Sequence, residues 1–257
     1  MPFPAYALIT GSSSGIGLEL AKQCATNKRN LILVARRNDA LQHIQKELAE
    51  KFGVDVVIMP HDLSKPHAAK ELHDMILSRG LVVDVLINNA GFGDYGMFVE
   101  TDLEKEMNMI DLNVKALTEL TKHVSKGMKA RGSGYIMNVA STAAFQPGPL
   151  MAVYFATKAY VLSFSEAIGN ELAPFGVSVT TLCPGPTNTA FQDRAFGNDS
   201  FFKGAMTPEA VAKIGYAGMM KKKSVVIPGL KNKLLAFSVR LTPRKMVTAV
   251  ARRMFER

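Results

Sequence analysis

The sequence predicts an α/β fold, with helices on both faces of a parallel sheet of about seven strands. Two observations indicate this class. Short apolar runs rich in β-branched residues alternate along the chain with longer segments of helical periodicity. The short runs are almost continuously apolar, as expected for strands whose two faces are both covered. We expect residues 1–257 to form one domain, in which residues 229–257 are a basic, amphipathic C-terminal extension.

The expected elements follow one another as repeated strand–helix units. The strands are predicted at residues 5–10, 30–35, 54–59, 83–88, 134–140, 177–182 and 223–228. The helices are predicted at residues 15–27, 38–52, 66–79, 102–130, 151–173 and 207–219. The last helix has Thr207 as its N-cap and Pro208 at its first position. Repeated units of this kind imply a doubly wound sheet.

Composition narrows the class of protein. The chain is 47% hydrophobic and 21% charged, which fits a globular protein with a sizeable core. The segment MPFPAYALIT lacks a basic stretch and a cleavage site, so we expect no signal peptide. No apolar run reaches the roughly 18 residues that a membrane span requires. Cys24 and Cys183 lie outside any metal-ligand spacing, so we expect no disulfide, no metal site and a cytoplasmic location.

The basic charge is concentrated near the end of the sequence. Net charge is +9, and residues 221–257 hold 11 of the 31 Lys and Arg but one of the 22 acids. Residues 1–220 are therefore nearly neutral. A basic amphipathic helix pair suits peripheral contact with an anionic membrane. The alternative is a pair that covers the substrate pocket or a subunit interface. No recognition motif accompanies the charge, so we expect no nucleic-acid partner.

A glycine-rich turn, TGSSSGIG at residues 10–17, joins the first strand to the first helix. Gly11, Gly15 and Gly17 permit a tight turn and close approach of a phosphate to backbone N–H groups. The positive end of the helix dipole then faces the phosphate. A flexible loop could have the same composition, but the position between a strand and a helix favours a Rossmann-like dinucleotide site.

The end of the second strand indicates which dinucleotide is bound. NAD-specific folds usually place an acid there to bind the ribose 2′-hydroxyl. Here the sequence has Ala35, followed by Arg36 and Arg37. Guanidinium groups suit a 2′-phosphate, so the sequence favours NADP(H) over NAD(H). The alternative is two solvated arginines at a strand end.

Polar motifs follow the next strands, at the edge where open α/β sheets bind ligands. HDL contains Asp62, which can accept a hydrogen bond from an adenine amino group, and NNAG brings backbone close to the adenine-side ribose. For Asp84 and Asn88 we favour a structural role that ties strands together. Ser141 follows the fifth strand, and Tyr154 and Lys158 in YFATK share one face of the next helix.

Together these features resemble the oxidoreductase branch of the short-chain dehydrogenase/reductase family. The resemblance covers residues 1–190 in order: TGSSSGIG, HDL, NNAG, Asn113, Ser141, YFATK and PGPTNT. It implies contacts to the cofactor from Gly11, Ser13, Ser14, Gly15, Ile16, Gly17, Arg36, Arg37, Asp62, Leu63, Asn89, Ala90, Gly91, Tyr154, Lys158, Pro184, Gly185, Thr187 and Thr189. It also implies a homodimer or homotetramer.

The resemblance implies a catalytic set of Asn113, Ser141, Tyr154 and Lys158. Tyr154 would be the acid in reduction and the base in oxidation. Lys158 would lower the phenol pKa from about 10 and hold the nicotinamide ribose. Ser141 would hydrogen-bond the substrate carbonyl oxygen. Asn113 would hold a water that links Lys158 to bulk solvent.

The sequence therefore predicts an NADP(H)-dependent oxidoreductase that interconverts a carbonyl and an alcohol. Three segments, 92–98, 143–152 and 189–206, are expected to border the substrate, the last as a mobile lid. Their apolar residues favour an acyl, steroid-like or aromatic ketone or aldehyde. They are Phe92, Tyr95, Met97, Phe98, Phe145, Leu150, Met151, Phe191, Phe196, Phe201 and Phe202. The alternative from another class is an NADP(H)-sensing binding module without turnover.

Overall fold

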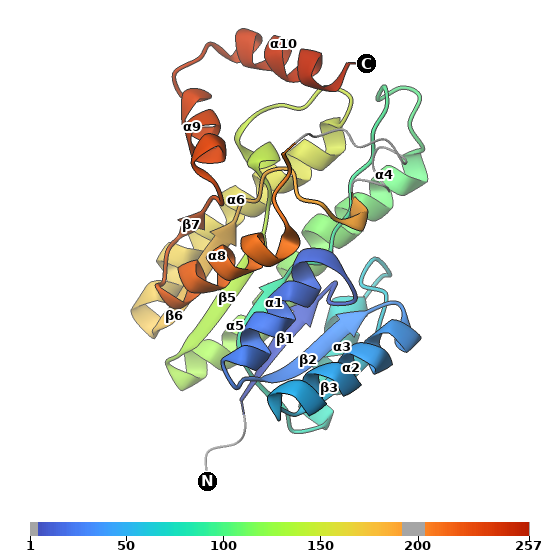
Figure 1. The fold of residues 1–257 in the computed structure, drawn as a ribbon, viewed down its shortest axis with the longest axis vertical. Helices are drawn as coiled ribbons and strands as arrows, with labels where there is room; N and C mark the ends of the chain where they lie inside the picture. The colour runs from blue at the N-terminus through green and yellow to red at the C-terminus, as the bar shows by residue number, and fades with distance from the viewer. Residues whose placement is uncertain (1–4, 192–203, 257) are drawn as a thin grey trace.

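A computed structural model describes residues 5–191 and 204–256 (Figure 1). The described residues contain a seven-stranded sheet in the order β3-β2-β1-β4-β5-β6-β7, in which all neighbours are parallel. The strands are β1 (Ala5–Thr10), β2 (Asn30–Ala35), β3 (Val56–Pro60), β4 (Val82–Asn88), β5 (Gly134–Val139), β6 (Val177–Leu182) and β7 (Val225–Val226). The α/β fold class is thus confirmed.

Helices cover both faces of the sheet (Figure 1). One face packs against α1 (Gly15–Thr26), α2 (Asn38–Phe52) and α8 (Pro208–Met220) around a first apolar core. The other face packs against α3 (Ala68–Ser78), α5 (Leu117–Arg131) and α6 (Ala152–Leu172) around a second core. Coverage on both sides explains why the strands are apolar along almost their whole length.

The strand order reverses between β1 and β4, which are parallel neighbours although two strands separate them in sequence. At such a switch point the connecting segments leave to opposite faces, and a crevice opens at the carboxyl ends of the strands. The predicted motifs follow the carboxyl ends of the strands, so they lie along this edge of the sheet. Two short 3-10 helices, η2 (Thr142–Phe145) and η3 (Ala173–Phe175), flank α6.

One predicted helix has a different internal structure. The sequence predicts a continuous helix over residues 102–130, whereas the structure has α4 (Leu103–Ile110), a π-helical segment η1 (Asp111–Ala116) and then α5. The predicted seventh strand, residues 223–228, is reduced to the two residues of β7. A strand at the edge of a sheet has one neighbour, so little backbone pairing extends it.

The C-terminal extension consists of α9 (Leu230–Ser238) and α10 (Arg244–Phe255), as expected from its amphipathic pattern. In Figure 1 both helices stand beyond the carboxyl edge of the sheet, away from the strands. Ala236, Val247, Ala251 and Phe255 are buried and attach the pair to the rest of the molecule. Within residues 5–191 and 204–256, no helix has the length and apolar character needed to cross a membrane.

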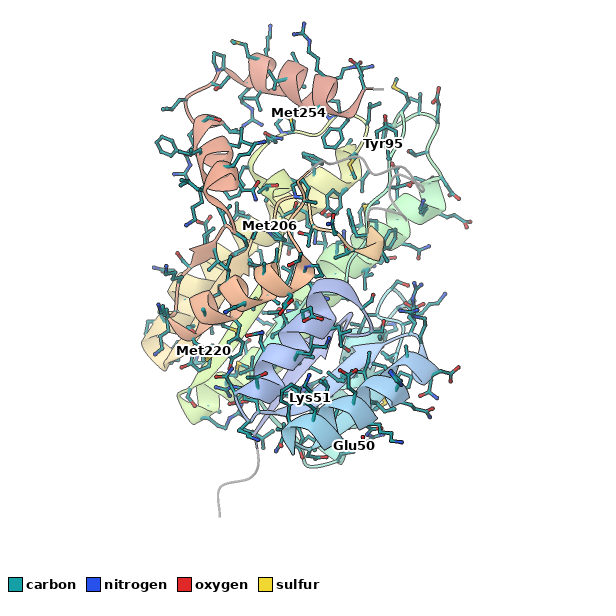
Figure 2. The ribbon with its side chains drawn as sticks, in the orientation of Figure 1. Glu50, Lys51, Tyr95, Met206, Met220 and Met254 are labelled. Carbon is teal, nitrogen blue, oxygen red and sulfur yellow. The ribbon has the colours of Figure 1, made fainter. Side chains whose placement is uncertain are left out.

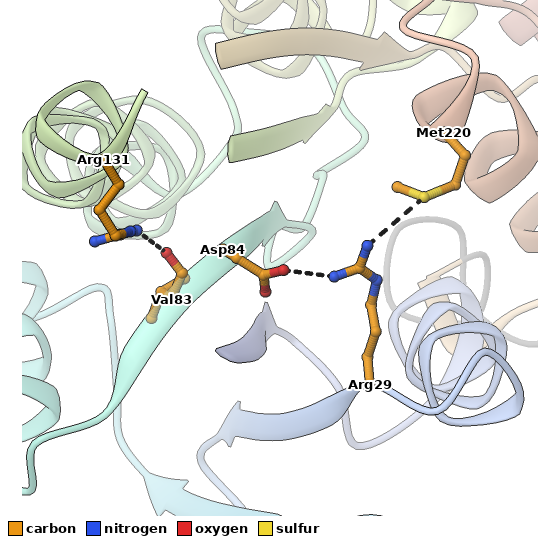
Figure 3. Close-up of polar contacts among 5 residues, drawn as sticks. All are labelled: Arg29, Val83, Asp84, Arg131 and Met220. Carbon is orange, nitrogen blue, oxygen red and sulfur yellow. Dashed lines mark hydrogen bonds and ion pairs between the residues drawn. The ribbon is translucent and has the colours of Figure 1, made fainter. Parts of the chain in front are cut away.

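Polar contacts near the amino ends of the strands are structural (Figure 3). Arg29 donates to Asp84 over 2.6 Å and also reaches the sulfur of Met220 at 4.0 Å. Inside the fold, Asn88 Nδ2 donates to Thr121 Oγ1 at 2.8 Å and to Asn138 Oδ1 at 2.9 Å. Asp84 and Asn88 thus tie strands to neighbouring elements, in agreement with the structural role favoured from the sequence.

Candidate active site

A cleft of about 1010 Å³ runs along the carboxyl edge of the sheet, from the glycine-rich turn to the two C-terminal helices. Its walls come from segments far apart in sequence. Among the predicted site residues, those that line it are Gly11, Ser13, Ser14, Gly15, Ile16, Arg36, Arg37, Asp62, Leu63, Asn89, Ala90, Gly91, Ser141, Tyr154, Lys158, Pro184, Gly185, Thr187 and Thr189. Gly17 and Asn113 do not line the cleft and lie behind its wall.

The glycine-rich turn is shaped by close backbone packing. Gly11 and Gly15 have φ of 66° and 58°, in the region that favours glycine. A Cβ on Gly17 would lie 2.4 Å from Asn89 Nδ2 and 2.4 Å from the Gly11 carbonyl oxygen. The side-chain amide of Asn89 in turn donates to the Thr10 carbonyl at 2.9 Å. The turn therefore fits a phosphate-binding cradle, with the side chain of Asn89 serving to hold it in place.

The start of α1 is free to bind an anion. Ser14 occupies the N-cap position, but its side chain does not accept a capping hydrogen bond from the helix. Backbone N–H groups of the first turn lie against the cleft, where the helix dipole favours negative charge. Together with the cradle of the turn, this arrangement fits the pyrophosphate of a dinucleotide.

Two arginines flank the same end of the cleft. Arg37 Nη2 donates to Ser13 Oγ at 3.4 Å, which brings the guanidinium to the glycine-rich turn. Partial burial raises the pKa of Asp62, but hydrogen bonds from Ser64 and the nearby charge of Arg36 lower it overall. Arg36 and Asp62 are thus close enough to interact. This end of the cleft offers guanidinium donors and a carboxylate acceptor together.

The predicted reactive side chains converge in the middle of the cleft. Tyr154 and Lys158 lie one turn apart on α6, and both are buried, with 9% and 6% of their surfaces exposed. Lys158 Nζ donates to the Val139 carbonyl at 2.9 Å and lies 5.8 Å from the centroid of the Tyr154 ring. Ser141 follows β5 and lies close enough to lower the pKa of Tyr154, while its Oγ donates to the Pro184 carbonyl at 3.4 Å. A serine, a phenol and an amine thus share one small volume.

The pKa of Tyr154 corrects one expectation from the sequence. Lys158 was expected to lower the phenol pKa, but burial raises the pKa of Tyr154 to about 12, against a smaller lowering from the Ser141 hydrogen bond. Burial likewise lowers the pKa of Lys158 to about 8. Desolvation disfavours the charged form of each group, so it raises the pKa of the phenol and lowers that of the amine. Tyr154 is therefore a protonated phenol at neutral pH.

Asn113 lies in η1, and its side chain is 1% exposed. Its Nδ2 donates to the Phe92 carbonyl at 2.9 Å and to Thr157 Oγ1 at 3.1 Å, while its Oδ1 accepts from Phe92 N at 3.2 Å. This side chain therefore joins the loop after β4 to α6. The described contacts of this amide are thus with backbone and a threonine hydroxyl. π-helical segments are frequent at functional sites.

Apolar side chains form the far end of the cleft. Of the residues expected to border substrate, Phe92, Phe145, Met151 and Phe191 line it, and the rings of Tyr154 and Phe191 lie 5.3 Å apart. The others that the structure describes do not line it: Tyr95, Met97, Phe98 and Leu150. Phe196, Phe201 and Phe202, and most of the expected lid, lie outside the described residues.

The C-terminal helices supply the rest of this wall, including residues that the sequence did not single out as pocket residues. They are Lys231, Asn232, Leu235, Ala236, Ser238, Val239, Thr242, Val247, Val250, Met254 and Phe255. Figure 2 labels Met254 on the side of α10 that faces the molecule, and Tyr95 nearby donates to the Phe255 carbonyl at 2.6 Å. Helical spacing in the sequence indicates the two helices, but not that they dock across the cleft. The extension thus covers the pocket, one of the two roles considered for it.

The comparison with known families agrees with this geometry. A family model described as short chain dehydrogenase matches residues 5–199. The chain belongs to the short-chain dehydrogenase family. It is therefore an oxidoreductase acting on carbonyl or alcohol groups. In the described residues, no cluster of three or more His, Cys, Asp or Glu is placed to hold a metal ion.

Individual relatives and solved structures resemble this short-chain dehydrogenase over most of its length. It is 30% identical over 233 residues to the very-long-chain 3-oxoacyl-CoA reductase of Anas platyrhynchos, covering 87% of this chain and 72% of the relative. A short-chain dehydrogenase of Sphingobium yanoikuyae, solved with NADPH, is 32% identical, with a TM-score of 0.84 over 92% of this chain and 93% of that one. The bulky-bulky ketone specific alcohol dehydrogenase of Comamonas testosteroni is 29% identical, with a TM-score of 0.80 over 92% of each chain.

Proposed function

We propose that this protein is an NADP(H)-dependent oxidoreductase that interconverts an apolar ketone or aldehyde and the corresponding alcohol, with Tyr154 as general acid and base. The observation that carries the proposal is the convergence of Ser141, Tyr154 and Lys158 between a dinucleotide cradle and an apolar wall. Residues chosen only for packing would not bring a buried lysine and a buried phenol to the floor of an open cleft.

In the reductive direction, a bound NADPH would supply the hydride that the carbonyl carbon receives. Tyr154, whose raised pKa keeps it protonated at neutral pH, donates its phenolic proton to the carbonyl oxygen. Ser141 turns its hydroxyl from the Pro184 carbonyl, a 3.4 Å contact, to the same substrate oxygen. The ammonium of Lys158 stabilises the phenolate as it forms, and so lowers the cost of proton transfer.

Proton return to Tyr154 is assigned to Lys158 and Asn113. The pKa of Lys158, lowered to about 8 by burial, allows it to gain and lose a proton near neutral pH. The amide of Asn113 already bonds Phe92 and Thr157, so it fixes the backbone around η1. We assign to η1 the water that links Lys158 to solvent, held at Asn113.

The preference for NADP(H) rests on Arg36 and Arg37. Two guanidinium groups beside Ser13, with no acid at Ala35, suit a 2′-phosphate. The relative from Sphingobium yanoikuyae was solved with NADPH, which supports the same preference. An acyl, steroid-like or aromatic substrate fits the phenylalanine and methionine wall, and the names of the relatives include a long-chain 3-oxoacyl-CoA and a bulky ketone.

A turnover assay with matched variants tests the proposal. Purified protein should oxidise NADPH in the presence of a panel of apolar ketones and aldehydes. Tyr154→Phe should lower kcat by a factor of about 1,000 or more, because it removes the proton donor, yet leave NADPH affinity within about twofold. Arg36→Ala should raise the KM for NADPH by about tenfold, because one charged hydrogen bond to the cofactor is lost. The KM for NADH should not change.

Two results would contradict this function. Full activity of Tyr154→Phe would exclude the proposed acid. Tight NADPH binding with no turnover over a broad carbonyl panel would support the alternative, a module that senses NADP(H) without catalysis.

A further inference from the structure

Helix α9 and the turn after it expose an apolar face. Leu230, Leu234, Phe237 and Leu241 follow one another at helical spacing and share one side, which we call the apolar stripe. Their exposed fractions are 72%, 62%, 58% and 75%. Surface helices normally turn such residues toward the core, so a contiguous exposed row marks a surface that binds something.

The other sides of α9 are already engaged. Asn232 and Ala236 face the body of the protein, where a Cβ on Gly185 would lie 2.5 Å from Asn232 Nδ2. Lys231, Leu235 and Ser238 line the cleft. The apolar stripe lies on the opposite side of α9 from the residues that face the body. It therefore points away from the protein and cannot be buried by a small movement of α9 toward it.

The charge around the apolar stripe is uniformly positive. Lys233 and Arg240 are exposed beside it. The sequence has no Asp or Glu between Glu209 and Glu256. A second copy docked through the same face would set Lys233 and Arg240 against their own counterparts, which costs energy. An anionic partner has the complementary charge.

We propose that the apolar stripe and its basic flanks dock on the surface of an anionic phospholipid bilayer. The leucines and Phe237 would enter the boundary between headgroups and acyl chains, while Lys233 and Arg240 contact lipid phosphates. Leu235 and Met254 line the cleft and are yet 51% and 50% exposed, so the cleft opens beside this surface. An apolar substrate dissolved in the bilayer then has a short path to Tyr154; this last step rests on the proposed function, whereas docking does not.

Vesicle sedimentation of the full chain, without substrate, tests the docking. The protein should bind vesicles of phosphatidylcholine mixed with phosphatidylglycerol, and bind vesicles of phosphatidylcholine alone at least about tenfold more weakly. Leu234→Ser should weaken binding by about tenfold through the loss of apolar insertion. The matched control is Leu77→Ser on α3, whose leucine is 59% exposed and which should not change binding.

Charge is tested in the same way. Arg240→Glu should weaken binding to the mixed vesicles by about tenfold, and Arg79→Glu, at the end of α3, should not. NADPH affinity, measured in parallel, should be unchanged in all four variants, which separates loss of docking from loss of folding or of the cofactor site.

Three results would overturn the proposal. The first is equal vesicle binding by the wild type, Leu234→Ser and Arg240→Glu. The second is equal binding to neutral and anionic vesicles. The third is a change in oligomeric state of Leu234→Ser, measured by light scattering, with unchanged vesicle binding, which would assign the stripe to a contact between copies of this chain.

Discussion

At the scale of single residues, burial controls the acidity of the Tyr154 and Lys158 pair. The pKa of Tyr154 is raised to about 12 and that of Lys158 is lowered to about 8, both chiefly by desolvation. At neutral pH the resting pair is therefore a neutral phenol beside an ammonium. In the proposed reduction, this state can give a proton to a carbonyl without prior ionisation of Tyr154.

Lys158 makes the stability of the fold depend on pH. Its pKa is about 8 when folded and 10.5 when unfolded, so between these values the unfolded chain holds more protons. The contribution of Lys158 is present above pH 10.5 and is lost as pH falls through about 8. Relative to Lys158→Met, the wild type should gain up to about 3 kcal/mol of unfolding free energy across this window.

Urea unfolding of the two proteins at several pH values measures this gain. Lys46→Met, at an exposed position on α2, is the control and should track the wild type at every pH. A constant difference between wild type and Lys158→Met across the window would show that the pKa of Lys158 is not depressed in the folded protein.

At the scale of elements, α9 is attached to the loop after β6 by a close contact. A Cβ on Gly185 would lie 2.5 Å from Asn232 Nδ2 and 2.7 Å from its Oδ1, and the same amide donates to the Pro228 carbonyl at 2.7 Å. The absence of a side chain at residue 185 therefore sets how closely α9 approaches the cleft. The Asn232 side chain therefore packs directly on the backbone of Gly185.

Gly185→Ala should displace α9. We expect a loss of about 1–3 kcal/mol in the free energy of unfolding, because an extra methyl group is forced into a filled site. Under the proposed function, the KM for the carbonyl substrate should also rise, since residues of α9 line the cleft. Adding Asn232→Ala removes the collision, so a double-mutant cycle of unfolding free energies should show coupling of about 1 kcal/mol or more. Simple additivity of the two changes would contradict this packing.

Sequence patterns predict the elements and the strand-end residues well, because each is encoded locally. The strands at residues 5–10, 30–35 and 177–182 have the bounds that the structure shows. Parallel pairing then brings the ends of β1, β4 and β5 to one edge without further information. The polar residues that follow those strands could therefore be placed together in advance.

Other features depend on contacts that no local pattern encodes. The π-helical segment at Asn113 follows from bonds to Phe92 and Thr157, which are 21 and 44 residues away. The pKa of Tyr154 follows from how deeply α6 is buried. The wall contributed by α9 and α10 requires their docking across the cleft, a tertiary contact at long sequence separation. These are the places where the sequence interpretation was incomplete or wrong.

At the scale of the whole molecule, the described residues show two regions of different packing. Strands β1, β4 and β5 are sealed between two layers of helices, and Leu8, Leu86 and Ile136 are fully buried. Helices α9 and α10 lie outside these layers and hold few buried side chains. Local opening should therefore begin at the C-terminal helices.

Native-state hydrogen exchange tests this difference. Amides of α9 and α10 should exchange at least about 100-fold faster than those of β1, β4 and β5, because they open without disrupting the main cores. The measurement should be made on protein free of lipid. Protection of α9 equal to that of β1 would show that the extension unfolds only with the sheet.

Gly91 has a consequence for the entropy of the reactive centre. A Cβ at this residue would lie 2.8 Å from Asn113 Oδ1 and 3.5 Å from Lys158 Nζ, so bare backbone closes around the amine. A lysine side chain on a protein surface samples many rotamers, and fixing it costs about 2 kcal/mol. Here Gly91 and the Val139 carbonyl confine Lys158 as the chain folds. Ligand binding then has no such ordering cost left to overcome, and the amine is already held 5.8 Å from the centroid of the Tyr154 ring.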